Sequence, residues 1–302
     1  MEMPNCIIAF PGRDAVVKGM SNTFLDKFSL VKQVFEKASY FMSYDIAKAC
    51  YSGTLIDERW QTICLITHCY AVYKVLESLY GRPAAFAGYS QGEFAACTAS
   101  GVFEFPGILG LVYHLEHLLY SEKGDYECMY RMIDISTNTL MDCCHAIDSR
   151  EVNVSISAYI SDTQNIISGK LNDVKKVIGL AKQKGARWAI DLQAGRAYHS
   201  SLCRSTAQKA RPYFDETRIC DAIAPVYSCY DGMKCSDAEV IRGKLSMQIS
   251  HPIQWSKIVT NAISDGIFNM IEIGPGCTVS ANTRIADSRM NCRWVGKTDD
   301  LW

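Results

Sequence analysis

A glycine–serine–glycine turn at residues 88–92 constrains this chain more than any other feature of its sequence. Residues 88–93 read Gly-Tyr-Ser-Gln-Gly-Glu. The apolar run 84–87 before them fits a short buried strand, and the small apolar residues 94–97 after them fit a helix packed on a sheet. This order is typical of a nucleophile elbow, a sharp turn that presents a serine. The alternative is an ordinary strand-to-helix turn in which Ser90 only caps the helix.

A nucleophilic serine needs a base, and the chain contains six histidines. They are His68, His114, His117, His145, His199 and His251. His199 follows an extended run and lies in a loop, from which a side chain can reach another element, so it is modestly favoured. His68 lies in an apolar stretch and fits the core. His145 follows two cysteines, but no further ligands stand at metal-site spacing, so no metal site is expected.

Further motifs stand in order along the chain. They are Phe10-Pro11-Gly12, Ser168-Gly169, Ala197-Tyr198-His199-Ser200, the spaced set Gln248, Pro252 and Trp255, and Glu272-Ile273-Gly274-Pro275-Gly276. With the Ser90 turn, they resemble the malonyl-CoA:acyl carrier protein transacylase family, which includes the acyltransferase domains of fatty acid and polyketide synthases. The resemblance covers nearly the whole chain. It implies an α/β fold, in which a large α/β-hydrolase-like domain carries an inserted small ferredoxin-like domain.

The resemblance also implies a mechanism. His199 takes the proton of Ser90, which attacks an acyl thioester and forms an acyl-serine ester. The backbone N–H groups of Gln91 and Arg13 form the oxyanion hole, and a backbone carbonyl at Gln248 orients the imidazole. No acidic third member is needed. A carrier-protein thiol or water then releases the acyl group.

The most informative departure from the family lies at Leu115. The family's extender-unit transacylases carry an arginine at this helix position, where it pairs with the malonyl carboxylate. No arginine occurs from residue 83 to residue 130. A malonyl carboxylate facing Leu115 would be buried without a partner, which costs several kcal/mol. We therefore expect a pocket for a neutral acyl chain.

Other candidate selectivity residues flank the pocket in the family's pattern. Tyr89 stands where the family usually has histidine, and Ile160 lies where it usually has asparagine. Tyr198 precedes the proposed base. Arg196 is the one nearby cation that could serve an acidic substrate, but its loop setting favours a solvated residue at the rim. Asp14 replaces a glycine of the first loop, which puts the geometry of that loop in doubt.

Three classes of function remain. Family members without the arginine occur as discrete proteins in polyketide pathways whose modules lack their own acyltransferase domains, and several resemble acyl hydrolases that clear stalled acyl groups from carrier proteins. The first class is therefore an acyl-thioester hydrolase. The second is a trans-acting acyltransferase for a neutral or unusual acyl group. The third is an inactive carrier-binding homologue, which the presence of both Ser90 and His199 disfavours.

Composition fits an enzyme that works in the cytoplasm. Of the 302 residues, 48% are hydrophobic, which is enough to form a large core. The net charge is −1, so no strong positive electrostatic potential is expected to attract nucleic acid or an anionic membrane. No apolar run is long enough to span a membrane, and no signal peptide is evident. The 14 cysteines are dispersed, as is typical of reduced thiols.

The expected partner is an acyl carrier protein, and we expect a monomer with no cofactor, because the substrate arrives on the carrier's phosphopantetheine. An acidic carrier needs a basic surface. One candidate, which fits a solvated helix face at least as well, comprises Lys170, Lys175, Lys176, Lys182, Lys184 and Arg187.

The chain divides by its patterns into a large domain, residues 1–126 and 193–302, and a small domain, residues 127–192. For the large domain we expect strands at 6–10, 84–87, 225–228 and 269–272, and helices at 22–38, 62–80 and 106–119. For the small domain we expect strands at 129–135, 152–160, 165–168 and 186–192, and a helix at 171–184. This order fits a ferredoxin-like unit. A cleft between the domains is the expected ligand site.

Overall fold

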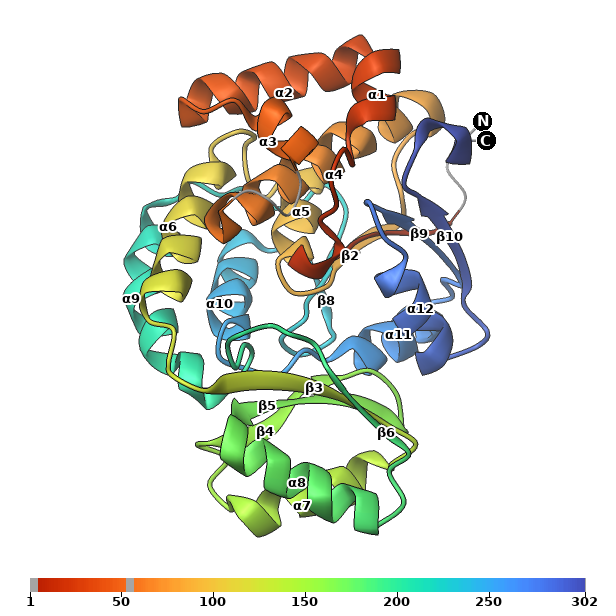
Figure 1. Ribbon diagram of the computed structural model, residues 1–302. Helices are drawn as coiled ribbons and strands as arrows, with labels where there is room; N and C mark the ends of the chain where they lie inside the picture. The colour runs from red at the N-terminus through yellow and green to blue at the C-terminus, as the bar shows by residue number, and fades with distance from the viewer. Residues whose placement is uncertain (1–4, 53–56, 302) are drawn as a thin grey trace.

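The computed structural model describes residues 5–52 and 57–301, which form two separate sheets. The six-stranded sheet lies among helices in the upper part of Figure 1, and the four-stranded sheet lies below it. The predicted α/β fold class is confirmed, since helices cover both faces of a largely parallel sheet.

The six-stranded sheet, called the large sheet here, has the order β10-β9-β1-β2-β7-β8. Its strands are β1 (Ile7–Phe10), β2 (Ala85–Gly88), β7 (Val226–Tyr227), β8 (Lys234–Cys235), β9 (Asn269–Ile273) and β10 (Asn291–Val295). β8 is antiparallel to β7, and the other pairs are parallel. Along β1, Ile8 and Phe10 enter one core cluster and Ile7 and Ala9 enter another, so both faces of this strand are buried.

Helices close both of these clusters. The first cluster contains side chains from α1 (Asn22–Lys27), α2 (Ser29–Met42), α3 (Ile46–Ser52), α4 (Glu58–Tyr80), α5 (Gly92–Ala99), α6 (Ile108–Ser121), α9 (Arg204–Glu216) and α10 (Ala238–Gln248). The second contains side chains from α11 (Trp255–Ser264) and α12 (Thr278–Ala286). Short 3-10 turns are η1 (Arg13–Ala15), η3 (Ser201–Cys203) and η4 (Thr298–Asp300). None of the helices in the described part of the chain is long and apolar enough to cross a membrane.

The four-stranded sheet, called the small sheet here, is antiparallel with the order β4-β5-β3-β6. Its elements are β3 (Glu127–Ile133), α7 (Thr137–Ile147), β4 (Val154–Tyr159), β5 (Gln164–Lys170), α8 (Leu171–Gln183) and β6 (Trp188–Asp191). This order and topology are those of a ferredoxin-like unit. Met132 packs with α7 and α8, whereas Met129 and Ala158 pack with the second cluster of the large sheet. The small sheet therefore lies between its own helices and the large sheet (Figure 1).

The expected helix at 22–38 is two helices in the structure. Phe28 adopts an extended conformation that ends α1 and precedes α2. The bend lets Phe24 and Val31, one on each helix, both be fully buried. The apolar spacing could not show this break because Phe28 itself fits the helical pattern. Helix α7 was not expected, although its N-cap, Ser136, accepts the Thr139 N–H and is a sequence signal for a helix start.

The Gly88 position tolerates no side chain, because a Cβ there would lie 2.2 Å from backbone atoms of Gly92. We expect Gly88→Ala to lower the free energy of unfolding by more than ~3 kcal/mol, or to prevent folding. Gly179→Ala is the matched control, since no atom lies within 4 Å of the added methyl group in α8. It should stabilise the protein by roughly 0.5–1 kcal/mol. Urea unfolding measures the free energy of unfolding of both variants. Equal values for Gly88→Ala and Gly179→Ala would contradict the close approach of the Gly88 and Gly92 backbones.

Candidate active site

Ser90 occupies the sharp turn between β2 and α5. Its φ is +55°, in the left-handed region that residues other than glycine seldom adopt. Gly88 and Gly92 allow the turn because each lies against backbone: a Cβ on Gly92 would be 2.3 Å from the Phe10 carbonyl oxygen. The turn holds the Ser90 side chain at the N-terminus of α5, where N–H groups without helical partners favour negative charge.

The loop after β1 lies beside this turn. The Tyr89 N–H donates to the Phe10 carbonyl at 2.9 Å. A Cβ built on Gly12 would lie 3.6 Å from the Ser90 Cβ, so the backbone next to Arg13 is close to the serine. Arg13 and Gln91 line the same cavity as Ser90. The structure thus brings together the backbone segments expected to form an oxyanion hole.

His199 reaches Ser90 from the loop between β6 and α9. Its Nε2 lies 2.7 Å from the Ser90 Oγ, and its Nδ1 lies 2.8 Å from the backbone carbonyl oxygen of Gln248. His199 also has a positive φ, +56°. The Gln248 side chain donates from Nε2 to the Ser90 carbonyl at 3.3 Å, so the end of α10 contacts both members of the pair.

The bonds of His199 define how it can act. Burial lowers its pKa to about 4, while the hydrogen bond to the Gln248 carbonyl raises it. The ring is therefore neutral near pH 7, and Nδ1 carries the proton, because a carbonyl can only accept. Nε2 then has a free lone pair that can accept the Ser90 hydroxyl proton, for which Gln91 Oε1 is a second acceptor at 2.7 Å. This is the arrangement that a general base requires.

The other histidines are engaged elsewhere. His68 is fully buried, and its Nδ1 lies 3.0 Å from Ser21 Oγ, as fits the core position expected of it. His114 stacks on Tyr213, and His117 packs on Tyr113. His145 pairs with Glu151, and His251 contacts the Met247 carbonyl oxygen. None of these five histidines lines the Ser90 cavity.

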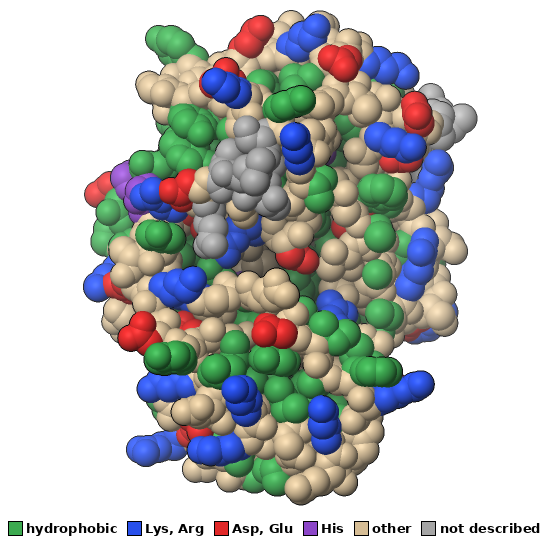
Figure 2. Space-filling view, in the orientation of Figure 1, with side chains coloured by type: hydrophobic (Ala, Val, Ile, Leu, Met, Phe, Trp, Pro, Cys, Tyr) green, Lys and Arg blue, Asp and Glu red, His purple; other side chains and the backbone are tan. Residues whose placement is uncertain are grey.

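The cavity that contains Ser90 and His199 has a volume of about 520 Å³. Gly12, Arg13 and Tyr89 come from the large-sheet side, and Met129 and Arg131 come from the small sheet. A hollow is visible on the face of Figure 2 between the two parts of the molecule. The cavity thus lies in the cleft expected between the two sheets.

Leu115 lies beside the reactive pair. A chamber of about 20 Å³ adjoins Ser90 and His199 and is lined by Leu115, Leu119 and Phe94, among others. Leu115 is buried on α6. The wall next to the serine is therefore apolar where the resemblance would place an arginine. Tyr198 lines both the chamber and the main cavity.

The side chain of Arg13 is a feature that the sequence analysis missed, because only its backbone was assigned a role. Its guanidinium donates from Nη1 to Glu116 Oε2 at 3.1 Å and from Nη2 to Tyr198 Oη at 2.6 Å. Thr62 Oγ1 donates to the other Glu116 oxygen at 2.7 Å. The signal available in the sequence was the pair of unusual charged residues, Arg13 in the first loop and Glu116 after Leu115.

The structure corrects two expectations about selectivity residues. Arg196 is not at a solvated rim: it is 1% exposed, and it donates to the Leu119 carbonyl and to Thr206 Oγ1. It does not line the Ser90 cavity. Ile160 is fully buried in the second core cluster and does not line that cavity either. Both residues support the walls rather than contact the cavity.

The basic residues considered for carrier binding do not face the cavity. Lys175, Lys176 and Lys182 belong to α8, which covers the face of the small sheet turned away from the large sheet (Figure 1). Lys176 pairs with Asp173 on the same helix. This placement fits the alternative of a solvated helix face.

Glu93 lies behind the serine turn and is almost fully buried. Burial raises its pKa to about 7, and its Oε1 accepts the Cys229 N–H at 3.1 Å. The residue ties the start of α5 to the segment after β7. Glu93 does not line the Ser90 cavity, so we assign it a structural role.

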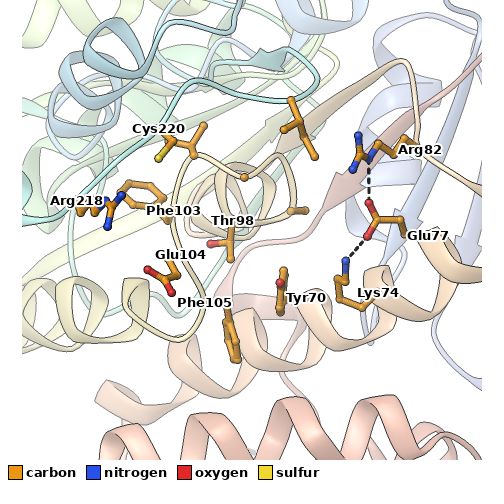
Figure 3. Close-up of a pocket in the computed structure, with 14 residues that line it drawn as sticks. Tyr70, Lys74, Glu77, Arg82, Thr98, Phe103, Glu104, Phe105, Arg218 and Cys220 are labelled. Carbon is orange, nitrogen blue, oxygen red and sulfur yellow. Dashed lines mark hydrogen bonds and ion pairs between the residues drawn. The ribbon is translucent and has the colours of Figure 1, made fainter.

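A second cavity of about 600 Å³ lies away from Ser90 (Figure 3). Tyr70 and Phe105 stack in its wall, and Glu77 bonds both Lys74 and Arg82. It contains no histidine or serine that could form a reactive pair. Among the described residues, no group of three or more His, Cys, Asp or Glu side chains is placed to hold a metal ion.

Two relatives that are similar to this chain in sequence carry the same name. A malonyl CoA-acyl carrier protein transacylase from Bacillus subtilis is 26% identical over 305 residues, covering 99% of this chain and 76% of the relative. One from Escherichia coli is 27% identical over 293 residues, covering 95% and 94%. No family model matches the chain.

Solved structures agree with these sequences. An acyl carrier protein S-malonyltransferase from Vibrio cholerae superimposes with a TM-score of 0.94 at 25% identity, over 98% of both chains. The malonyl-transacylase in the complex PlMCAT:AntF, solved with its type II polyketide synthase acyl carrier protein, gives 0.93 at 24% identity. Fold and site together define a serine-nucleophile enzyme of the acyl-transferring class. Over nearly its whole length the chain is similar to malonyl-CoA–acyl carrier protein transacylases.

The two buried histidines predict a dependence of stability on pH. Burial lowers the pKa of His68 to about 4, as it does for His199. Between pH ~6.5 and ~4 the unfolded chain binds protons that the folded chain does not, so stability present above pH 6.5 is lost as pH falls. His68→Gln should reduce this slope by about 1.4 kcal/mol per pH unit. Urea unfolding at pH 4.5, 5.5 and 6.5 measures the slope, and an unchanged slope would contradict burial of a neutral ring.

Proposed function

We propose that the protein takes a neutral acyl group from an acyl carrier protein thioester onto Ser90 and releases it to water, which makes it an acyl hydrolase of a polyketide or fatty-acid-like pathway. The observation that supports this proposal most is the 2.7 Å contact between Ser90 Oγ and a neutral His199, next to a small chamber lined by Leu115. The carrier-protein partner is suggested by the names of the relatives and by the solved complex with a carrier protein.

The acylation half-reaction follows from the geometry. The Ser90 hydroxyl proton moves to His199 Nε2 while Oγ attacks the thioester carbonyl carbon. The carbonyl oxygen becomes an oxyanion, which the N–H groups of Gln91 and Arg13 stabilise. When the intermediate collapses, the carbon–sulfur bond breaks and the pantetheine thiolate takes the proton from His199. The product is an ester of Ser90.

Deacylation repeats the same proton transfers with a new nucleophile. Water loses a proton to His199 and attacks the ester carbonyl, and Ser90 Oγ leaves with that proton. The carboxylic acid is then released. The Gln248 carbonyl keeps the imidazole aligned in both halves through its bond to Nδ1. No cofactor enters these steps, since the substrate is carried on the phosphopantetheine of its carrier.

Transfer to a second carrier thiol is the alternative. All of the relatives described above are named as transacylases or malonyltransferases, which favours it. The two reactions use the same protein groups and differ only in the nucleophile of the second step. Intact mass spectrometry of acyl carrier proteins after incubation with the protein separates them: free carrier with released acid means hydrolysis, and an acylated second carrier means transfer.

Replacement of either reactive residue should abolish turnover. We expect Ser90→Ala and His199→Ala each to lower kcat/KM by ~10³-fold or more, because residues that act as one unit lose similar amounts. The wild-type protein should form an acyl adduct on Ser90 that peptide mass spectrometry detects. His145→Ala, at an exposed site on α7, is the control. Full activity in the Ser90 variant, or an acyl group on another residue, would contradict the assignment.

Leu115 should favour neutral over acidic acyl groups. We expect an acetyl-loaded carrier protein to be turned over ~10²-fold faster than a malonyl-loaded one, because a carboxylate beside Leu115 loses its water without gaining a partner. Leu115→Arg should narrow this difference, whereas Leu115→Met, which keeps the size and the neutrality, should preserve it. The measurement is kcat/KM for both carriers. A wild-type preference for malonyl would overturn the neutral-acyl proposal.

A further inference from the structure

We infer that Glu116 is a specificity determinant of this site: its carboxylate neutralises Arg13 and thereby prevents the cavity from accepting acyl groups that carry a carboxylate. This inference rests on the proposed acyl-Ser90 reaction and names the device that restricts its substrate class. It concerns Arg13 in the first loop and the buried acidic residue that pairs with it.

The carboxylate of Glu116 is held at both oxygens. Oε2 lies 3.1 Å from Arg13 Nη1, and Oε1 accepts the Thr62 hydroxyl at 2.7 Å. The side chain is only 2% exposed. A carboxylate so buried and so bonded is held beside its cation and cannot turn away into solvent.

Arg13 lies at the same cavity as the reactive pair. Arg13 lines the cavity with Ser90 and His199. Its Nη2 donates to Tyr198 Oη at 2.6 Å, and its Cζ lies 5.2 Å from the centre of the Tyr198 ring. Tyr198 directly precedes His199 and lines the chamber beside Leu115. A cation therefore stands close to the place where an acyl group on Ser90 must lie.

The charge of this cation is already matched. A malonyl carboxylate that approached Arg13 would become the second anion on one guanidinium, next to the buried Glu116 carboxylate. The two anions repel each other, and one guanidinium does not fully compensate both. A neutral acyl group meets no such penalty. Because Leu115 and Glu116 are consecutive on α6, one helix supplies both the apolar wall and the opposing charge.

Three other charged residues line the cavity and set the controls. They are Asp14, Arg131 and Asp191. Arg131 projects from β3 and donates to Asn282 Oδ1 at 3.0 Å. Asp191 on β6 accepts the Tyr130 hydroxyl at 3.2 Å. An effect that depends on Glu116 through Arg13 differs from a general effect of negative charge, which Asp191→Asn would reproduce.

The test is the ratio of kcat/KM for a malonyl-loaded to an acetyl-loaded carrier protein. Glu116→Gln keeps the size of the side chain and removes its charge, and it should raise this ratio ~10-fold or more. In the double variant Arg13→Gln with Glu116→Gln the gain should disappear. Asp191→Asn should leave the ratio within about twofold of wild type. Damage to folding alone would lower both rates and leave the ratio unmoved.

Arg13→Gln alone gives a second measurement if Glu116→Gln fails to fold. It leaves the buried carboxylate without this cation, so the malonyl to acetyl ratio should fall at least severalfold. An unchanged ratio in a Glu116→Gln variant whose acetyl rate is retained, a gain that survives loss of Arg13, or an equal gain in Asp191→Asn would overturn the inference. A wild-type preference for malonyl would instead overturn the neutral-acyl proposal itself, so the two failures are distinguishable.

Discussion

The reactive site depends on how closely two backbone segments approach each other at the end of the parallel strands β1 and β2. A Cβ on Gly92 would lie 2.3 Å from the Phe10 carbonyl oxygen, and one on Gly88 would collide with Gly92 itself. This contact fixes the turn that holds Ser90 at a φ of +55° and brings the first loop beside it. The strained backbone conformation of Ser90 persists because the packing of the surrounding sheet holds it in place. The placement of Ser90 and that of the Arg13 segment beside it both follow from one close approach.

The second half of the pair comes from a distant part of the chain. His199 follows the small sheet, and Ser168 on β5 donates to the Tyr198 carbonyl at 3.1 Å, which ties the His199 loop to that sheet. The end of α10 holds the imidazole from the other side through the Gln248 carbonyl. The two sheets thus share the cavity, and the base stands where they meet. Its burial there keeps the ring neutral and ready to accept a proton.

The sequence predicted what depends on local pattern and on ordered motifs. The Ser90 turn, the His199 loop and the strands 6–10 and 84–87 carry strong local signals, and the structure places the serine and histidine in contact. Burial in a loop has no such signal, so Arg196 was expected at a rim although it is enclosed. The Arg13 to Glu116 bond joins residues 103 positions apart, and no periodicity reports it. The break at Phe28 was hidden because an apolar residue fits both a helix and its end.

The group that orients His199 is part of the main chain, and this has a consequence for how the site can vary. In a triad with an aspartate, one substitution removes the orienting group and its charge together. Here any residue at position 248 brings a carbonyl oxygen, so point substitution cannot delete the acceptor and only a shift of α10 can misplace it. Substitution at position 248 therefore leaves the acceptor for His199 in place. A change in the packing of α10, by contrast, can disturb the alignment of the imidazole. If α6 determines acyl selectivity, as we propose, that selectivity can change through substitutions on α6 while the proton-transfer geometry stays as it is.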